Sequence, residues 1–407
     1  MRAEPAIAEE PMLRSLDRWW FGYGSPTSLG IFRILIGTLA FLNLMMLTLD
    51  WGTWYGENGF VPAWLGQVAL GKTVATGIGF DLNRIGLISG VTNPYLAVGF
   101  FALTAVFAVT TALGLYTRAS TFLLAIFLVS LHHRNTIILH GGDTVMRIFV
   151  LYLAVSPCGR ACSLDRLFRV RRGEETGPVE AAVYGQRLVQ FNLALIYLTT
   201  VWAKFFGALW RNGTATWYTA RLREFYRFPV PHFFIDLPFV RLTTYGTFVT
   251  EFSLATLVFF RPLRPYVLLM GVLLHGFIEY AMNIPLFSFL MISGYVCHFE
   301  GEEVSAWCKR VGVRLWPLMG LEVYLPPGLK LTPNGERFLR AVDPFGFVRY
   351  LPNTHVSDQH LGWDAKRDNG KRSNPFRGVA YRAPGAWPFL IVPTLWKRVQ
   401  LGCLEAA

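Results

Sequence analysis

The segment 131–147, LHHRNTIILHGGDTVMR, concentrates side chains that can bind ligands or transfer protons. It holds three histidines, two arginines, an asparagine and an aspartate within seventeen positions, between apolar runs. Helical spacing would place His133 and His140 on one face, and Asp143 and Arg147 at i and i+4, where an ion pair is expected. A glycine pair between them predicts a turn. The segment therefore predicts a re-entrant helical hairpin whose polar tip faces a water-accessible cavity.

More ionisable residues lie in apolar runs farther along the chain. Lys204 shares a helical face with Tyr197, His275 and Glu279 are four residues apart, and Glu251 interrupts another apolar run. Such residues cost a few kcal/mol each inside a membrane and usually face one another or a cavity. Each one alone is explained by contacts that hold helices together. The whole set at one depth favours a functional cavity.

Three chemistries fit such a cavity. A zinc or iron site could use His133, His140, Asp143 and His275, but no HExxH signature is present, and no metal is predicted. An ion-coupled transporter would need the same buried charges, but repeated halves are not visible. In acid–base catalysis, desolvation disfavours the ammonium form of a buried lysine, which makes the neutral amine available as a base.

The composition is that of a membrane protein. Of the 407 residues, 53% are hydrophobic and only 16% are charged, and the mean hydropathy is +0.37. The fold class predicted is an all-α polytopic membrane protein with about eight transmembrane helices, because about twenty apolar residues cross a bilayer. The predicted spans are 28–48, 94–115, 119–139, 143–157, 183–205, 242–260, 265–282 and 284–299.

The net charge of +12 is assigned to membrane topology rather than to nucleic acid, because the basic residues lie in short loops and in the tail. Arginines in 158–182 and the RPLR hairpin at 261–264 place these loops inside, with both termini cytoplasmic and the polar cavity on the outer side. The predicted domains are a cytoplasmic segment 1–27, a transmembrane domain 28–299 and a polar α/β appendage 300–407. Five scattered cysteines do not form a disulfide framework.

Four sequence blocks carry a resemblance to a known family. FRILIG, WYGENGFVP, HGGDTVMRIFVLYLAVSPCGRACSLDR and LIYLTTVWAKFFGALWRNGTATWY resemble the HTTM family, the membrane domains related to vitamin K-dependent gamma-carboxylase. The resemblance covers about residues 15–300 and implies a bacterial homologue in the inner membrane, with its active side periplasmic. The appendage resembles thiol-oxidoreductase-like DCC domains but lacks their Cys-x-x-Cys pair.

In the carboxylase, a lysine deprotonates vitamin K hydroquinone, which reacts with oxygen to form a strong base. That base removes a glutamate γ-proton, and the carbanion adds to carbon dioxide. The resemblance implies that Lys204 is the base and that the cofactor is a vitamin K or menaquinone hydroquinone. The stretch around His140–Asp143 is similar in place to the carboxylase segment near the quinone, as a region rather than residue by residue. Together with the shared depth of the polar groups, this predicts Lys204, His140 and Asp143 as catalytic. The residues expected to bind the quinone are His133, Asn135, Arg147, Tyr197, Trp202, His275 and Glu279.

The departures from the family bear on the substrate. The carboxylase has a large lumenal β-rich domain that holds its protein substrate, and this chain shows no such domain. The expected partners are the lipid bilayer, a quinone and a protein or peptide acceptor. An alternative function, on the same scaffold, is a non-catalytic membrane factor for maturation, immunity or transport.

Overall fold

The computed structural model is mostly helical. It describes residues 12–62, 65, 86–88, 91–175, 177–219, 221–319, 321–325, 329–352, 380–382 and 404–406. The chain divides into two compact units, each made of two chain segments. Unit 1 comprises Met1–Ser163 and Glu180–Glu300, and unit 2 comprises Leu164–Val179 and Gly301–Ala407.

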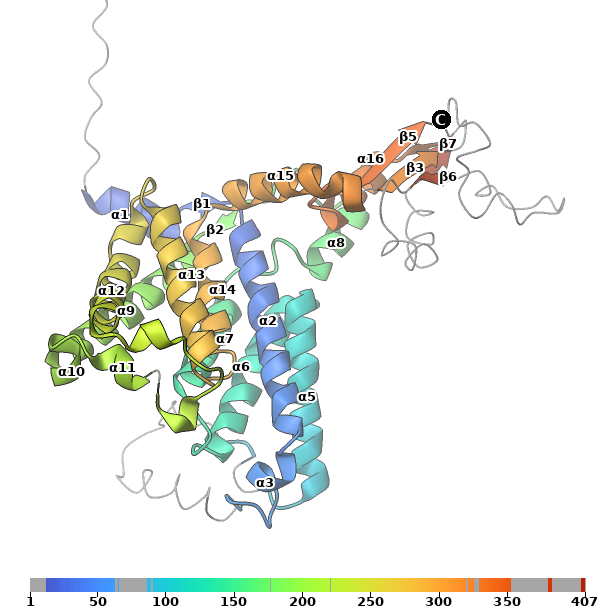
Figure 1. Ribbon diagram of the computed structural model, residues 1–407. Helices are drawn as coiled ribbons and strands as arrows, with labels where there is room; N and C mark the ends of the chain where they lie inside the picture. The colour runs from blue at the N-terminus through green and yellow to red at the C-terminus, as the bar shows by residue number, and fades with distance from the viewer. Residues whose placement is uncertain are drawn as a thin grey trace, which may run out of the picture. The chain divides into compact units, whose positions relative to one another are not determined.

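Unit 1 is a helical bundle (Figure 1). Its main helices are α2 (Thr27–Thr48), α5 (Pro94–Leu113), α6 (Thr117–Arg134), α7 (Gly141–Val155), α9 (Tyr184–Phe206), α12 (Leu237–Ala255), α13 (Arg264–Ala281) and α14 (Phe287–Gly294). Shorter helices are α1 (Met12–Phe21), α3 (Trp51–Tyr55), α10 (Ala208–Arg211), α11 (Ala215–Thr219), η2 (Arg223–Phe225), η3 (His232–Ile235), η4 (Leu257–Phe259) and η5 (Tyr295–His298).

Three of these helices are long and apolar enough to cross a membrane, within the part of the chain that the structure describes. They are α2, α5 and α9, and a shorter apolar helix covers Phe287–His298. These helices support the expectation of an integral membrane protein. The number of eight crossings stays a prediction.

Local sequence signals explain where α5 begins and ends. The Asn93 side chain accepts hydrogen bonds from the backbone N–H groups of Tyr95 and Leu96, and proline occupies the first helical position. Both are preferred helix-starting signals. The helix ends at Gly114, whose φ of 68° is a left-handed conformation that favours glycine.

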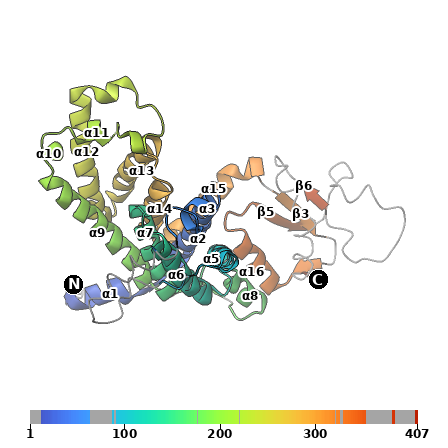
Figure 2. The ribbon, with the colours of Figure 1, turned by 90° about the horizontal axis from the view of Figure 1, so that it is seen from below.

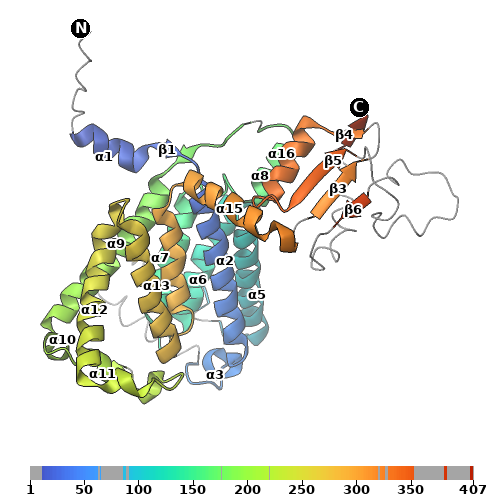
Figure 3. The same ribbon diagram turned by 45° about the horizontal axis from the view of Figure 1, so that its top comes forward.

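Helices α2, α5, α6 and α7 pack in sequence order, and α9 packs against α12 (Figure 3). The core of unit 1 includes Phe32, Ile36 and Phe149, which are fully buried. Gly37 lets α2 approach α5 closely, because a Cβ there would lie 2.6 Å from the backbone nitrogen of Ala112. Their contact is therefore backbone to backbone.

Arg33 lies fully buried in α2, and its guanidinium group donates hydrogen bonds to backbone carbonyls. Its Nη1 donates to the Thr111 and Ala112 carbonyls (2.8 Å for the latter), where α5 ends. Its Nε and Nη2 donate to the carbonyls of Cys158 (3.3 Å) and Cys162 (2.5 Å). One side chain thus joins α2 to the end of α5 and to the segment after α7.

Contacts between distant chain segments fix the start of α9 in unit 1. Strand β1 (Tyr23–Gly24) pairs antiparallel with β2 (Ala181–Ala182), with Tyr23 opposite Ala182. Gln186 and Gln190, on the first turns of α9, both donate to the carbonyl of Cys297. These bonds fix the start of α9 against η5.

Unit 2 combines short strands with helices α8 (Leu164–Arg171), α15 (Gly301–Met319) and α16 (Pro333–Val342). Strands β5 (Val348–Pro352), β3 (Leu321–Leu325) and β6 (Ala380–Arg382) form one sheet in that order, and β4 (Leu329–Leu331) pairs with β7 (Leu404–Ala406). Helix α16 packs on α8 through Val170, Phe338 and Leu339 (Figure 2).

Candidate functional site

Lys204 forms an ion pair between two helices. It lies in the last turn of α9, and its Nζ contacts Oε1 of Glu251 on α12. The other carboxylate oxygen of Glu251 accepts a hydrogen bond from the Thr200 hydroxyl at 3.3 Å. The ammonium group also lies 4.9 Å from the ring centroid of Trp210, within cation–π range. The carboxylate is buried, whereas the lysine is partly exposed.

A second polar cluster lies two turns earlier on α9. The Tyr197 hydroxyl is 2.8 Å from Nε2 of His275 on α13 and 2.6 Å from the Tyr295 hydroxyl on η5. All three side chains are buried. Thr200 links the two clusters, because its hydroxyl lies 2.9 Å from the Tyr197 carbonyl and 3.3 Å from Oε2 of Glu251. The residues around the end of α9 therefore behave as one polar network.

His140 caps helix α7. Its Nδ1 accepts a hydrogen bond from the backbone N–H of Gly142 at 3.0 Å, and Asp143 Oδ2 accepts one from the His140 backbone N–H at 2.9 Å. Because Nδ1 is an acceptor, a neutral His140 carries its proton on Nε2, which lies 3.6 Å from the same Asp143 oxygen. His140 is thereby arranged as a hydrogen-bond donor.

The predicted pairing within 131–147 is partly wrong. Helix α6 ends at Arg134, so His133 and His140 share no helical face. In this fully described segment, Asp143 and Arg147 do not form an ion pair within 4.0 Å; Arg147 Nη1 instead lies 3.3 Å from His133 Nε2. The glycine pair does not form the turn either, because it begins α7. Helix capping, which uses Asp143, competes with the expected ion pair.

Arg134 and Asn135, in segment 131–147, form hydrogen bonds to the chain that follows α2. The Asn135 side chain donates to the Trp54 carbonyl at 2.9 Å, and its own oxygen accepts from the backbone N–H of Ile137. The Arg134 guanidinium donates to the Val61 carbonyl at 2.8 Å. The predicted quinone-binding Asn135 therefore makes contacts that position α3 and the residues after it.

Phe287 connects the α7 terminus to the α9 network. A Cβ at Gly142 would lie 3.5 Å from the Phe287 Cα. The Phe287 ring in turn meets His275 edge-on, with centroids 5.6 Å apart. A continuous set of contacts thus joins the start of α7 to Tyr197 and His275.

Two predicted site residues lie outside this set. Glu279 pairs with Arg227, which also donates to the Glu279 carbonyl at 3.0 Å. Trp202 points away from the buried side of α9, with 68% of its surface exposed, and packs on Phe206. Helical periodicity accounts for this, since Trp202 is two residues from Lys204 and five from Tyr197.

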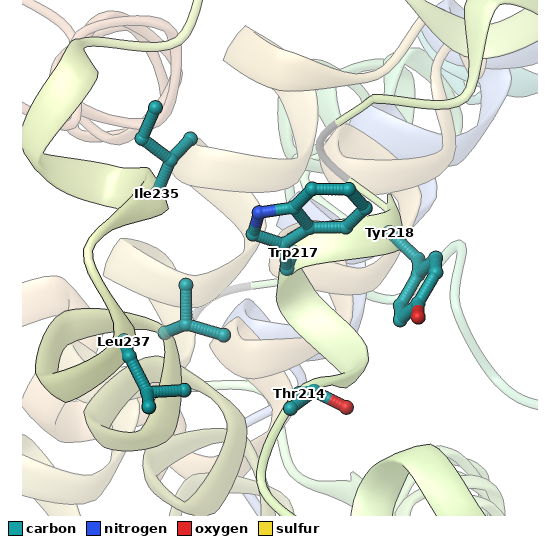
Figure 4. Close-up of a pocket in the computed structure, with 6 residues that line it drawn as sticks. Thr214, Trp217, Tyr218, Ile235 and Leu237 are labelled. Carbon is teal, nitrogen blue, oxygen red and sulfur yellow. The ribbon is translucent and has the colours of Figure 1, made fainter.

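A cavity of about 270 Å³ adjoins the GTATWY block. It is lined by Thr214, Trp217 and Tyr218 on one side and by Ile235, Leu237 and Val240 on the other (Figure 4). The neighbouring Thr216 hydroxyl contacts the hydroxyls of Thr243 and Thr244, each at 2.8 Å. These bonds hold α11 on α12, and the cavity itself is mostly apolar.

Glu251 is the site residue that the sequence did not assign. It was visible as a carboxylate in an apolar run, and such a group requires a partner. The cationic side chain that pairs with Glu251 is determined by how α9 and α12 pack, which the sequence does not show. No cluster of three or more histidine, cysteine or acidic side chains that could hold a metal occurs among the residues described.

Comparison with family models gives a match to the HTTM domain over residues 76–302. The chain belongs to the HTTM family. The predicted resemblance is thus confirmed, and the matched residues include all of α5 to α14, with both the HGGD and the GTATWY blocks. The curated proteins and the solved structures that were compared contain no match.

Proposed function

We propose that this HTTM protein is an integral membrane enzyme that resembles vitamin K-dependent gamma-carboxylase. It would couple epoxidation of a vitamin K or menaquinone hydroquinone by oxygen to a carboxylation by carbon dioxide. The supporting observation is that Lys204, paired with buried Glu251, adjoins the buried Tyr197–His275–Tyr295 cluster. In this proposal, eight spans cross a bacterial inner membrane, the termini are cytoplasmic and Lys204 faces the periplasm.

The residues present suit a quinone headgroup. A quinol needs hydrogen-bond partners for two oxygens and an apolar surround. Nδ1 of His275 is buried without a partner among the described residues, and Nδ1 of His132 is likewise unpartnered. Phe287 supplies an aromatic face beside His275. When bound, a hydroquinone supplies the electrons that reduce oxygen.

The chain's own part in this reaction is to move one proton. A lysine acts as a general base only as the neutral amine, and Lys204 is held in an ion pair. Glu251 is the adjacent group that can take the lysine's proton, and Thr200 holds the carboxylate in place. Lys204 would then accept the hydroxyl proton of the quinol. Glu251 thus belongs to the proposed catalytic machinery with Lys204.

His140 and Asp143 have a different role in this proposal. Both are engaged in capping α7, so His140 offers an Nε2–H donor rather than a free base. It would donate a hydrogen bond to a quinol oxygen, and Asp143 would hold it in orientation. Arg147, one turn farther along α7, would support this arrangement through its contact with His133 on α6.

The test uses purified wild type, Lys204→Ala, Glu251→Gln and Lys309→Ala in detergent. Each protein receives vitamin K hydroquinone or menaquinol with oxygen, and epoxide and labelled carbon dioxide uptake are followed. General-base catalysis is worth about 10²–10⁴-fold, so Lys204→Ala should lower the epoxide rate by at least about 100-fold. Glu251→Gln should also lower it, whereas exposed Lys309 should be neutral.

Full epoxide formation by Lys204→Ala would show that the base is assigned to the wrong residue. Silence in every protein, with no quinone bound, would favour the non-catalytic membrane factor. In that case the Lys204–Glu251 pair is a helix-to-helix contact only. Label uptake in the wild type would identify the protein or peptide acceptor.

A further inference from the structure

A second cavity, of about 460 Å³, lies between α1 and the first turns of α9 and α13. Arg187, Gln190, Arg264 and His298 line it from the bundle, and Ser15 and Trp19 from α1. It is remote from the proposed active site, because Lys204 occupies the opposite end of α9. Figure 3 shows α1 at one end of the bundle and α10, which follows Lys204, at the other.

The charge of this cavity is positive. It brings together the guanidinium groups of Arg187 and Arg264, and both act electrostatically on the buried His298. Glu300 pairs with Arg261 and also acts electrostatically on Arg187, but one carboxylate does not neutralise three guanidinium groups. Asp17 on α1 is exposed. The cavity therefore fits an anionic ligand.

The two arginines are fixed in place by the protein. Arg187 donates to the Trp19 carbonyl at 3.1 Å and to Gln190 Oε1 at 3.0 Å, and its guanidinium lies 4.9 Å from the Trp19 ring centroid. Arg264 donates to the Val258 carbonyl at 3.3 Å. Ordered guanidinium groups lose little side-chain entropy when they bind an anion, and their planar geometry suits phosphate oxygens.

Helix α1 has the character of an interfacial helix. Leu16 is 47% exposed and Phe21 is 62% exposed on it, while Trp19 and Trp20 pack against Phe259 and Phe191 of the bundle. Tryptophan rings of this kind mark the headgroup level of a bilayer. A basic cavity between membrane helices, at that level, is typical of lipid headgroup sites.

We propose that the cavity bounded by α1, α9, α13 and η5 binds the phosphate of an anionic phospholipid headgroup. Arg187 and Arg264 contact the phosphate, and Ser15 lies at the rim. The acyl chains lie along the exposed apolar surface beside α1. The ligand comes from the bilayer rather than from solution.

The test measures lipid binding by native mass spectrometry of the full chain in detergent. Short-chain phosphatidylglycerol, short-chain phosphatidylcholine and inorganic phosphate are the probes. Loss of one hydrogen bond to a charged group corresponds to about tenfold or more in affinity, so Arg187→Gln and Arg264→Gln should each weaken phosphatidylglycerol binding by that factor. Arg223→Gln removes the same charge at an exposed position elsewhere and should leave binding unchanged.

A variant at the rim separates binding from folding. Ser15 is exposed and its replacement breaks no described hydrogen bond, so Ser15→Glu should repel the phosphate whereas Ser15→Gln should not. Equal phosphatidylglycerol binding by all variants would overturn the proposal. Binding of inorganic phosphate with the same arginine dependence, and no gain from the lipid form, would overturn the bilayer as the source.

Discussion

Replacement of Arg33 by methionine tests how much a fully buried arginine contributes to the stability of unit 1. The side chain is fully buried, and it donates to the carbonyls of Thr111, Ala112, Cys158 and Cys162. Methionine fills similar space without any donor. Four carbonyls at the meeting point of three chain segments would then lose their common partner.

The magnitude follows from two opposing effects. A hydrogen bond from a charged group contributes about 1.5–3 kcal/mol, so four such bonds amount to roughly 6–12 kcal/mol before offsets. Removal of the buried charge returns several kcal/mol of desolvation free energy. Of the two α5 carbonyls, that of Thr111 also keeps its hydrogen bond from the Gly114 backbone N–H at 3.1 Å. The expected loss in the free energy of unfolding is about 3–5 kcal/mol.

The assay is unfolding of the detergent-solubilised protein in a denaturing-detergent titration, followed by tryptophan fluorescence. Arg33→Lys keeps the charge but lacks the planar fork, so it should lose about half as much as Arg33→Met. The control, Arg261→Met, removes an exposed arginine paired with Glu300 and should cost less than about 1 kcal/mol. An Arg33→Met protein within about 1 kcal/mol of wild type would refute the reasoning.

Two further predictions concern other parts of the chain. Gly37→Ala should destabilise unit 1 by about 1–3 kcal/mol, because its Cβ would lie 2.6 Å from the Ala112 nitrogen, while Gly99→Ala in α5, with open space, should stabilise by up to about 1 kcal/mol in the same unfolding assay. In unit 2, hydrogen bonds from Arg172 lower the pKa of the Glu174 carboxyl below its ordinary value. This contact is therefore present above the ordinary glutamate pKa and is lost as the pH falls, and an NMR titration of Glu174 should show a higher midpoint in Arg172→Gln. A stabilising Gly37→Ala, a destabilising Gly99→Ala or an unchanged Glu174 midpoint would contradict these predictions.

The sequence predicts what depends on one helix or on one family block. The periodicity of α9 places Tyr197 and Lys204 on the same side, and the two blocks around the HGGD and GTATWY motifs identify the family. The starts of the helices also follow from local signals, as Asn93 does for α5. These features need no knowledge of how helices pack.

Contacts between helices are the part that sequence reasoning could not supply. Whether Lys204 meets Glu251, or Tyr197 meets His275, depends on the packing of α9 against α12 and α13. Within 131–147, two local interactions competed for the same side chain. The i,i+4 pairing expected of Asp143 was replaced by its capping bond, which is stronger because it satisfies a backbone donor at a helix end.

Two pairings described above constrain how the chain is threaded through a bilayer. Strand β1 pairs with β2, so Tyr23 and Ala182 lie on the same side of the membrane. The chain between them must therefore cross an even number of times. Helices α2 and α5 are long and apolar enough to be two of these crossings.

The packing of α8 on α16 constrains the number of membrane crossings in residues 180–300 in the same way. Unit 2 is formed by chain segments that precede and follow residues 180–300. Because a small polar unit cannot fold across a bilayer, both segments lie on the same side of the membrane. The number of crossings in this stretch is again even. If α9 crosses, an even number requires a return crossing by at least one of α12, α13 and the Phe287–His298 segment, although α12 and α13 are not among the helices long and apolar enough to cross and Phe287–His298 is shorter.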